Sequence, residues 1–172
     1  MTNSPDGTAA MDPAEFRNVI GRFMTGVTVV TTAHGGALHG ITASAVASLS
    51  IDPPTLIVCL NKQSATRAAV AAAGRFVLNV LGADQAELAM HFASKLPEKF
   101  VRMAVEPGLH GLPRLPGAIA AIDCRVALEI DGGTHSIFVG RAEGAATAPG
   151  APLGYFRGRF IQVEDGQAGD RA

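Results

Sequence analysis

Residues 40–61, GITASAVASLSIDPPTLIVCLN, decide the fold of this 172-residue chain. Small apolar and hydroxyl side chains alternate over residues 41–51, and a period of two predicts a strand or a pair of strands. The face expected to pack against a core carries Ile41, Ala43, Ala45, Ala47, Leu49 and Ile51. The other face carries small hydroxyls, so a flat ligand could lie close to the backbone there. The corner Asp52-Pro53-Pro54 ends this segment, and the apolar run 55–60 predicts a strand buried on both faces.

The rest of the chain predicts further strands with only three short helices between them. Asp12 and Pro13 begin a helix whose apolar face carries Phe16, Val19, Ile20 and Phe23; Ser64 begins a second over 65–73, and Asp84 a third. Strands are expected over 27–32, 75–81, 118–130, 135–146 and 155–163, and 94–117 is expected to be a long loop or a lid. In the strand 118–130, Ala120, Ile122, Cys124, Val126, Leu128 and Ile130 should point inward and Asp123 outward.

This order of elements argues against a doubly wound parallel sheet, which needs a helix after nearly every strand. It favours a mainly β fold, an antiparallel Greek-key barrel with short helical insertions. We expect one domain over residues 12–163, with a disordered segment over 1–11 and a flexible tail over 164–172.

Composition excludes several classes of partner. The net charge is −1 with acids and bases mixed along the chain, so neither a nucleic-acid surface nor a polybasic membrane patch is expected. The two cysteines, Cys59 and Cys124, lie in apolar runs and predict reduced core thiols. Without a signal peptide or a membrane-spanning run in the sequence, we expect a cytoplasmic protein, and the apolar composition suggests self-association.

Two features indicate a ligand, and each has an ordinary structural alternative. Residues 61–66 lead from a buried strand into a helix, where backbone N–H groups, Ser64, Thr66 and Arg67 could hold a phosphate; the alternative is plain helix capping with a solvated arginine. Thr42 and Ser44 could bond a flat ring, or could lie on a solvent-facing strand surface. The proline corner joins the two segments, and together they suit a mononucleotide.

The five histidines lack metal-ligand spacing, so no metal site is expected. His135 begins a strand directly after a hairpin turn, where it either projects from a barrel rim or is simply an exposed strand-end residue. The sequence has no Gly-x-Gly-x-x-Gly after a strand, no Walker loop and no nucleophile elbow. A dinucleotide held in the Rossmann manner is therefore not expected.

Motifs along most of the chain resemble one family, in that family's order. They are FRNVIGRFMTGVTVVTT at 16–32, the strand 40–50, LSIDPP at 49–54, VCLNKQS at 58–64, FVLNVL at 76–81 with Gln85, Phe92-Ala93 followed by EKF at 98–100, PRLPGA at 113–118, the strand reaching Asp123-Cys124, the Gly-x-His turn at 133–135 and PLGY at 152–155. These motifs are similar to those of the short-chain flavin reductases, the reductase components of two-component flavin-dependent monooxygenases.

The resemblance implies a split β-barrel that binds FMN or FAD and works as a homodimer. It assigns residues 40–45 to the isoalloxazine ring, 59–61 to a second flavin contact, 64–66 to the phosphate, and His91 with Phe92 to the phosphate or nucleotide side. The implied cofactor-binding set is His39, Gly40, Ile41, Thr42, Ala43, Ser44, Ala45, Cys59, Leu60, Asn61, Ser64, Ala65, Thr66, His91 and Phe92. His135 is implied as the catalytic residue beside the nicotinamide, and Tyr155 as a second NAD(P)H contact.

The chain departs from the family pattern twice. Ala45-Val46 replaces a common Ser-Phe, and Thr134 replaces an aspartate before the histidine.

The leading hypothesis is an NAD(P)H:flavin oxidoreductase that supplies reduced flavin to a partner monooxygenase. The alternatives are a non-catalytic flavin- or haem-binding carrier or sensor, and an oxidase acting on a small phosphorylated substrate. FMN and FAD, and NADH and NADPH, remain alternatives as well.

Overall fold

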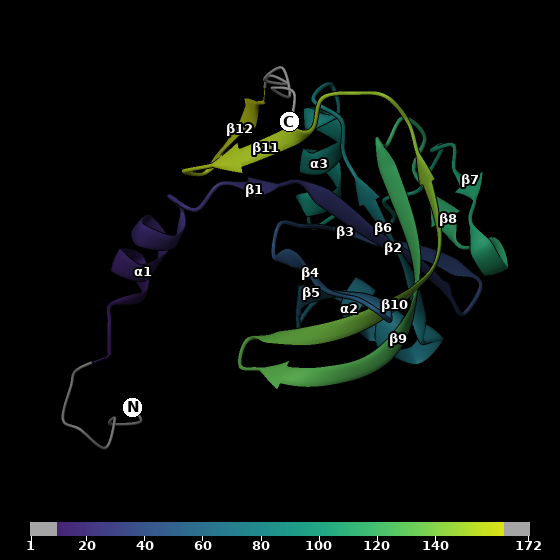
Figure 1. Ribbon diagram of the computed structural model, residues 1–172, viewed down its shortest axis with the longest axis horizontal. Coiled ribbons are helices and arrows are strands. Elements are labelled where there is room, and N and C mark those ends of the chain that lie inside the picture. The colour runs from purple at the N-terminus through teal and green to yellow at the C-terminus, as the bar shows by residue number, and fades with distance from the viewer. Residues whose placement is uncertain (1–9, 164–172) are drawn as a thin grey trace.

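The main element of the fold is a seven-stranded antiparallel sheet in the order β3-β2-β6-β9-β10-β5-β4, seen in a computed structural model that describes residues 10–163 (Figure 1). Its strands are β2 (Thr28–His34), β3 (Ala37–Ala43), β4 (Val46–Ile51), β5 (Pro54–Asn61), β6 (Arg75–Val80), β9 (Ala120–Gly132) and β10 (His135–Thr147). The two edge strands, β3 and β4, are consecutive in the chain and only Ser44 and Ala45 separate them. The chain thus passes directly from one edge strand to the other, and the Cys59 amide extends the β4–β5 pairing to this link by donating to the Ala45 carbonyl at 3.0 Å. The predicted mainly β, antiparallel fold is confirmed.

The remaining elements are two small sheets and the helices. A three-stranded sheet contains β1 (Thr25–Gly26), β11 (Leu153–Phe156) and β12 (Arg159–Gln162), and a two-stranded one pairs β7 (Glu106–Pro107) with β8 (Pro113–Arg114). The helices are α1 (Pro13–Ile20), α2 (Ala65–Ala73), α3 (Ala86–Ala93) and the 3₁₀ turn η1 (Leu109–Gly111). The region expected to be a long loop therefore contains β7, η1 and β8. Among the described residues, no helix is both long enough and apolar enough to cross a bilayer.

Two buried clusters lie on opposite faces of β2. Val30 belongs to the cluster inside the barrel, to which α2 contributes Val70. Val29 belongs to the second cluster, to which α3 contributes Ala89 and Phe92. Because β2 is covered on both faces, its β-branched run is buried almost throughout. The packing fixes α3 against the strand pair β2–β3, which positions one wall of the site described below.

The predicted inward face of residues 41–51 is wrong beyond Ala43. The Ser44–Ala45 link lies outside the strands, so the alternation of β3 does not continue into β4. Val46 packs against the core, whereas Leu49 is 55% and Ile51 is 89% exposed. In β5 the predicted burial on both faces is also wrong, because Leu56, Val58 and Leu60 are buried while the alternate side chains are only partly covered.

The predicted faces of β9 need a similar correction. Asp123, expected outside, is only 2% exposed, because its carboxylate pairs with the Arg114 guanidinium and accepts the Leu109 amide at 3.1 Å. Leu128 and Ile130, expected inside, are exposed, since the far half of β9 is a hairpin arm that extends past the barrel core (Figure 1).

Helix α1 begins as the sequence predicts, but it does not pack on its own chain. The Asp12 carboxylate accepts the Ala14 amide at 2.6 Å, and Pro13 occupies the first helical position. None of its residues is buried, and Phe16, Val19 and Ile20 are half exposed or more. Figure 1 shows α1 projecting away from the barrel. The expected disorder over 1–11 and 164–172 falls, apart from Ala10 and Met11, outside the described residues.

Candidate functional site

A groove with a volume of about 490 Å³ lies where three segments of the chain meet. Strand β3 supplies its floor, the turn entering α2 supplies one wall, and the segment after α3 supplies the other. The lining residues are Leu38, His39, Gly40, Ile41, Asn61, Gln63, Ser64, Ala65, Thr66, Ala93, Ser94, Lys95, Leu96, Pro97 and Lys99. Seven predicted cofactor-binding residues are therefore together in this groove: His39, Gly40, Ile41, Asn61, Ser64, Ala65 and Thr66.

The wall at α2 is a hydrogen-bonded turn that caps the helix. The Asn61 side-chain oxygen accepts the Gln63 amide at 2.8 Å, and the Ser64 hydroxyl oxygen accepts the amides of Thr66 at 3.1 Å and Arg67 at 3.4 Å. Ser64 thus caps α2 as predicted, and the capped turn brings the positive end of the helix to the groove. Such a terminus favours an anionic ligand group.

Arg67, expected to add charge at this turn, points elsewhere. Its guanidinium pairs with Glu129 and donates to the Ser136 hydroxyl at 3.0 Å. The positive charge comes instead from Lys95 and Lys99 on the opposite wall, which sequence reasoning missed. The only sequence signal for Lys99 was its place in the Glu98-Lys99-Phe100 motif.

Strand β3 is pressed against α3 on one face. A Cβ at Gly40 would lie 2.5 Å from the Phe92 ring, so only glycine fits there without moving that ring. The Thr42 hydroxyl donates to the Ala89 carbonyl of α3 at 2.6 Å. The alternation had suggested that this hydroxyl faces a flat ring. In the structure it instead bonds helix α3. Ala43 faces the barrel core.

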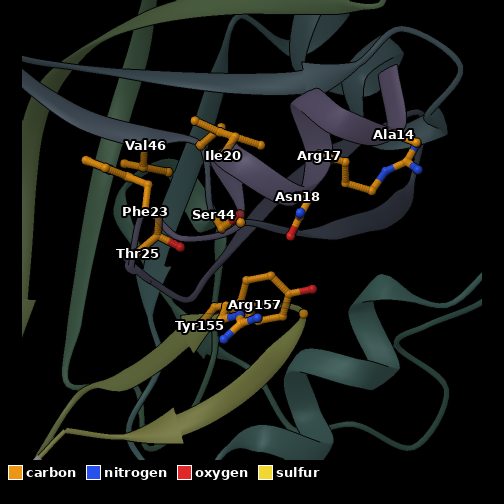
Figure 2. A pocket seen from close by; sticks show the side chains of 13 residues that line it. Ala14, Arg17, Asn18, Ile20, Phe23, Thr25, Ser44, Val46, Tyr155 and Arg157 are labelled. Carbon is orange, nitrogen blue, oxygen red and sulfur yellow. The ribbon is translucent and has the colours of Figure 1, made fainter. Parts of the chain in front are cut away.

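A second cavity, of about 750 Å³, lies at the other end of β3, and Ser44 and Ala45 line it. Figure 2 shows Tyr155 and Arg157 on one side of this cavity, with Asn18 and Ser44 across from them. Gly40 lines the groove and Ser44 lines the second cavity, so only four steps of the chain separate the two, and those within β3 rise about 3.3 Å each. The two cavities therefore suit a ligand with a phosphate at one end and a flat ring at the other.

The other predicted site residues lie around these cavities or in the core. Leu60 and Phe92 are fully buried, and His91 bonds to the Lys99 carbonyl through Nε2 at 2.7 Å. Cys59 is half-buried on the outer face of β5, and its burial raises the pKa of the thiol.

The two predicted nicotinamide residues do not meet in one cavity. His135 is paired with Asn61 across the β10–β5 ladder, which places it beside the groove, and its Nδ1 lies 2.9 Å from the Thr134 hydroxyl. Tyr155 lines the second cavity. Over residues 10–163, no three histidine, cysteine, aspartate or glutamate side chains are grouped to hold a metal ion.

The antiparallel sheet carries a groove with a capped helix start and two lysines, and a second cavity bordered by Ser44 and Ala45, an arrangement that suits a nucleotide-like cofactor. Residues 20–164 match the model of the flavin reductase like domain, and the chain belongs to this family, as its motifs predicted.

Characterised relatives cover nearly the same length. The reductase component of 4-nitrophenol 4-monooxygenase/4-nitrocatechol 2-monooxygenase from Rhodococcus opacus is 50% identical over 150 residues, 87% of this chain and 80% of that protein. The flavin-dependent monooxygenase reductase subunit HsaB of Mycobacterium tuberculosis is 38% identical over 160 residues, 91% of this chain and 86% of its own.

A solved structure of the Streptomyces globisporus NADH:FAD oxidoreductase SgcE6, in complex with NAD and FAD fragments, superposes with a TM-score of 0.84. It is 31% identical, and the match covers 92% of this chain and 98% of that one. The flavin reductase PheA2 superposes with a TM-score of 0.82 at 35% identity, over 90% of this chain and 99% of that one.

Proposed function

We propose that the chain is an NADH:flavin oxidoreductase that reduces FMN or FAD and supplies the reduced flavin to a partner flavin-dependent monooxygenase. Family membership and the monooxygenase reductase components among its relatives support this function. The observation that carries it is a pair of cavities at the two ends of β3, one with a helix N-terminus and two lysines, the other bordered by the small side chains of Ser44 and Ala45 directly after this strand.

The residues present fit a flavin. The turn at Ser64–Thr66 and the ammonium group of Lys95 would hold its phosphate end, and Ser44 with Ala45 would allow its ring to lie close to the backbone. A bound flavin supplies the redox chemistry, accepting a hydride from the nicotinamide. The chain binds and aligns the two rings, and this task needs no nucleophile. His135, beside the groove at Asn61, would orient the nicotinamide, and Tyr155, in the second cavity, would contact another part of the dinucleotide.

We also propose that the protein is a homodimer, because it leaves two apolar surfaces uncovered. One is the face of α1 with Phe16, Val19 and Ile20. The other is the outer face of the main sheet, where the row Ala47, Ile57, Val139 and Leu128 crosses four neighbouring strands. A second copy could cover both, and would bring further residues to the second cavity, which α1 borders (Figure 2).

The dimer is tested by light scattering. The expected mass is twice that of the 17.6 kDa chain. Ile20→Asp, on the apolar face of α1, should give monomers, whereas Glu15→Ala on the first turn should leave the dimer intact. A monomeric wild-type protein would contradict this part of the proposal.

The redox function is tested by anaerobic mixing of the purified protein with flavin and reduced nicotinamide dinucleotide. The four pairings of FMN or FAD with NADH or NADPH should be compared, and rapid bleaching of the flavin absorbance is expected with NADH. Binding of flavin without bleaching would instead indicate a carrier or sensor. A cytoplasmic location is part of the proposal, and the free thiols Cys59 and Cys124 support it.

A further inference from the structure

Within residues 10–163, the hydrogen bonds that join the groove wall 94–99 to the neighbouring elements lie at its two ends. At the first end, the Ser94 hydroxyl donates to the His91 carbonyl at 2.7 Å and the Ser94 amide to the Met90 carbonyl at 3.1 Å. Between the ends, residues 95–98 are exposed, and three of them line the groove. The width of the groove therefore depends on how firmly the second end is held.

Hydrogen bonds made by His91 and Lys99 hold the second end. The His91 ring nitrogen Nε2 lies 2.7 Å from the Lys99 carbonyl oxygen, and the Lys99 ammonium donates to the Phe92 carbonyl at 2.6 Å. The same ammonium donates to the Gly40 carbonyl at 3.3 Å, which ties the wall to the floor. The next residue, Phe100, packs edge-on against Phe92 at 5.2 Å between ring centroids.

We propose that Lys99 is a positioning residue which, together with His91, latches the wall 94–99 to strand β3 and so sets how long a flavin stays in the groove. This inference rests on the proposed function. His91 then acts through the wall and not by touching the flavin, because its Nε2 already faces the Lys99 carbonyl.

The partners of Lys99 suit a contact that opens and closes. Its ammonium bonds neutral carbonyl groups, and within residues 10–163 it makes no ion pair with a carboxylate. Partial burial lowers the pKa of Lys99, as expected for a charge removed from water without such a partner. A reductase that hands its flavin to another protein must release it, and a latch made only of such hydrogen bonds can break without exposing a buried ion pair.

The test compares Lys99→Met with Lys95→Met, since both lysines line the groove but only Lys99 bonds to its floor. Flavin dissociation is followed by fluorescence in stopped flow, with FMN and with riboflavin, which has no phosphate. Lys99→Met should speed the dissociation of both flavins about tenfold, as expected for losing one or two hydrogen bonds. Lys95→Met should affect FMN alone, and less so at high salt. Lys99→Arg should restore slow release in part.

If Lys99→Met speeds FMN release and leaves riboflavin unchanged, Lys99 is only a phosphate contact and the latch is wrong. Amide hydrogen exchange of segment 94–99 in the flavin-free protein gives an independent readout. Lys99→Met should raise exchange there and leave α2 unchanged; unaltered exchange would overturn the latch whatever the flavin result. A wild-type protein that binds no flavin would refute the proposed function separately.

Discussion

Replacing Gly40 by alanine should damage both the core and the site. The added Cβ would lie 2.5 and 2.7 Å from two carbons of the Phe92 ring and 3.2 Å from Phe100, whereas carbon atoms in contact prefer about 3.5–4.0 Å. The ring must therefore move by about 1 Å. Because Phe92 is 0% exposed and packed among buried side chains, it has no free space to enter. Overpacking of this kind costs about 1–3 kcal/mol.

The assay is denaturant unfolding at a fixed protein concentration, together with flavin titration. The expected loss of about 1–3 kcal/mol corresponds to a fall in Tm of about 3–9 °C for a domain of this size. Flavin affinity should fall as well, since the shift reaches the floor of the groove. Gly26→Ala is the matched control: nothing lies within 4 Å of its added Cβ, so a change of no more than about 0.5 kcal/mol is expected.

A double mutant separates the clash from other effects. Phe92→Leu shortens the side chain that the added Cβ would meet, so Gly40→Ala should cost much less in that background, with a coupling of about 1 kcal/mol or more. A Gly40→Ala protein as stable as the wild type, or an equal loss in Gly26→Ala, would refute the reasoning.

Three further predictions follow from the buried charges and the nicotinamide side. Asp123→Ala leaves Arg114 and the Leu109 amide without their partner and should cost about 3–5 kcal/mol in denaturant unfolding, with flavin affinity of the folded protein unchanged because Asp123 lines neither cavity. Burial first, then the nearby carboxylates, raise the pKa of Cys124 from 9.0 to about 12. The contribution of the protonated Cys124 thiol to the free energy of unfolding should therefore be complete below pH 9. It should fall by up to about 4 kcal/mol as the pH rises to 12, and Cys124→Ala should flatten this fall. His135→Ala should raise the KM for NADH more than the Kd for flavin; unchanged reductase kinetics would exclude its proposed role.

The sequence predicted the strand content because alternation and turn residues are local signals. Asp12 and Ser64 mark helix starts that the structure contains, and the corner at Asp52-Pro53-Pro54 separates β4 from β5. Side-chain direction was predicted less well, since it depends on where strands break. The break at Ser44 and Ala45 reverses the faces of β4, and no residue there signals it.

Charge placement depends on tertiary structure and was the weakest part of the sequence prediction. Asp123 and Arg114 are nine residues apart, and Arg114 reaches the Asp123 carboxylate from β8, while the Leu109 amide of η1 bonds the same carboxylate. Arg67 follows the predicted phosphate turn, on helix α2, but its guanidinium pairs with Glu129 on β9. Lys99, from a segment predicted only as a loop, reaches the floor of the groove instead.

The exposed apolar face of α1 shows a related limit. Its periodicity predicted a packed helix, and the helix forms, but what covers it lies outside a single chain if the dimer proposal holds. Helical periodicity predicts that an apolar face is covered, but it does not indicate whether the same chain or a second one covers it.

A crystal structure of the protein with FMN tests the central claim most directly. The account predicts the phosphate at the Ser64–Thr66 turn, facing Lys95. It predicts the flavin ring at the Ser44–Ala45 link, with His135 near the ring face on which the nicotinamide would lie. FMN bound anywhere else, with the groove along β3 empty, would contradict it.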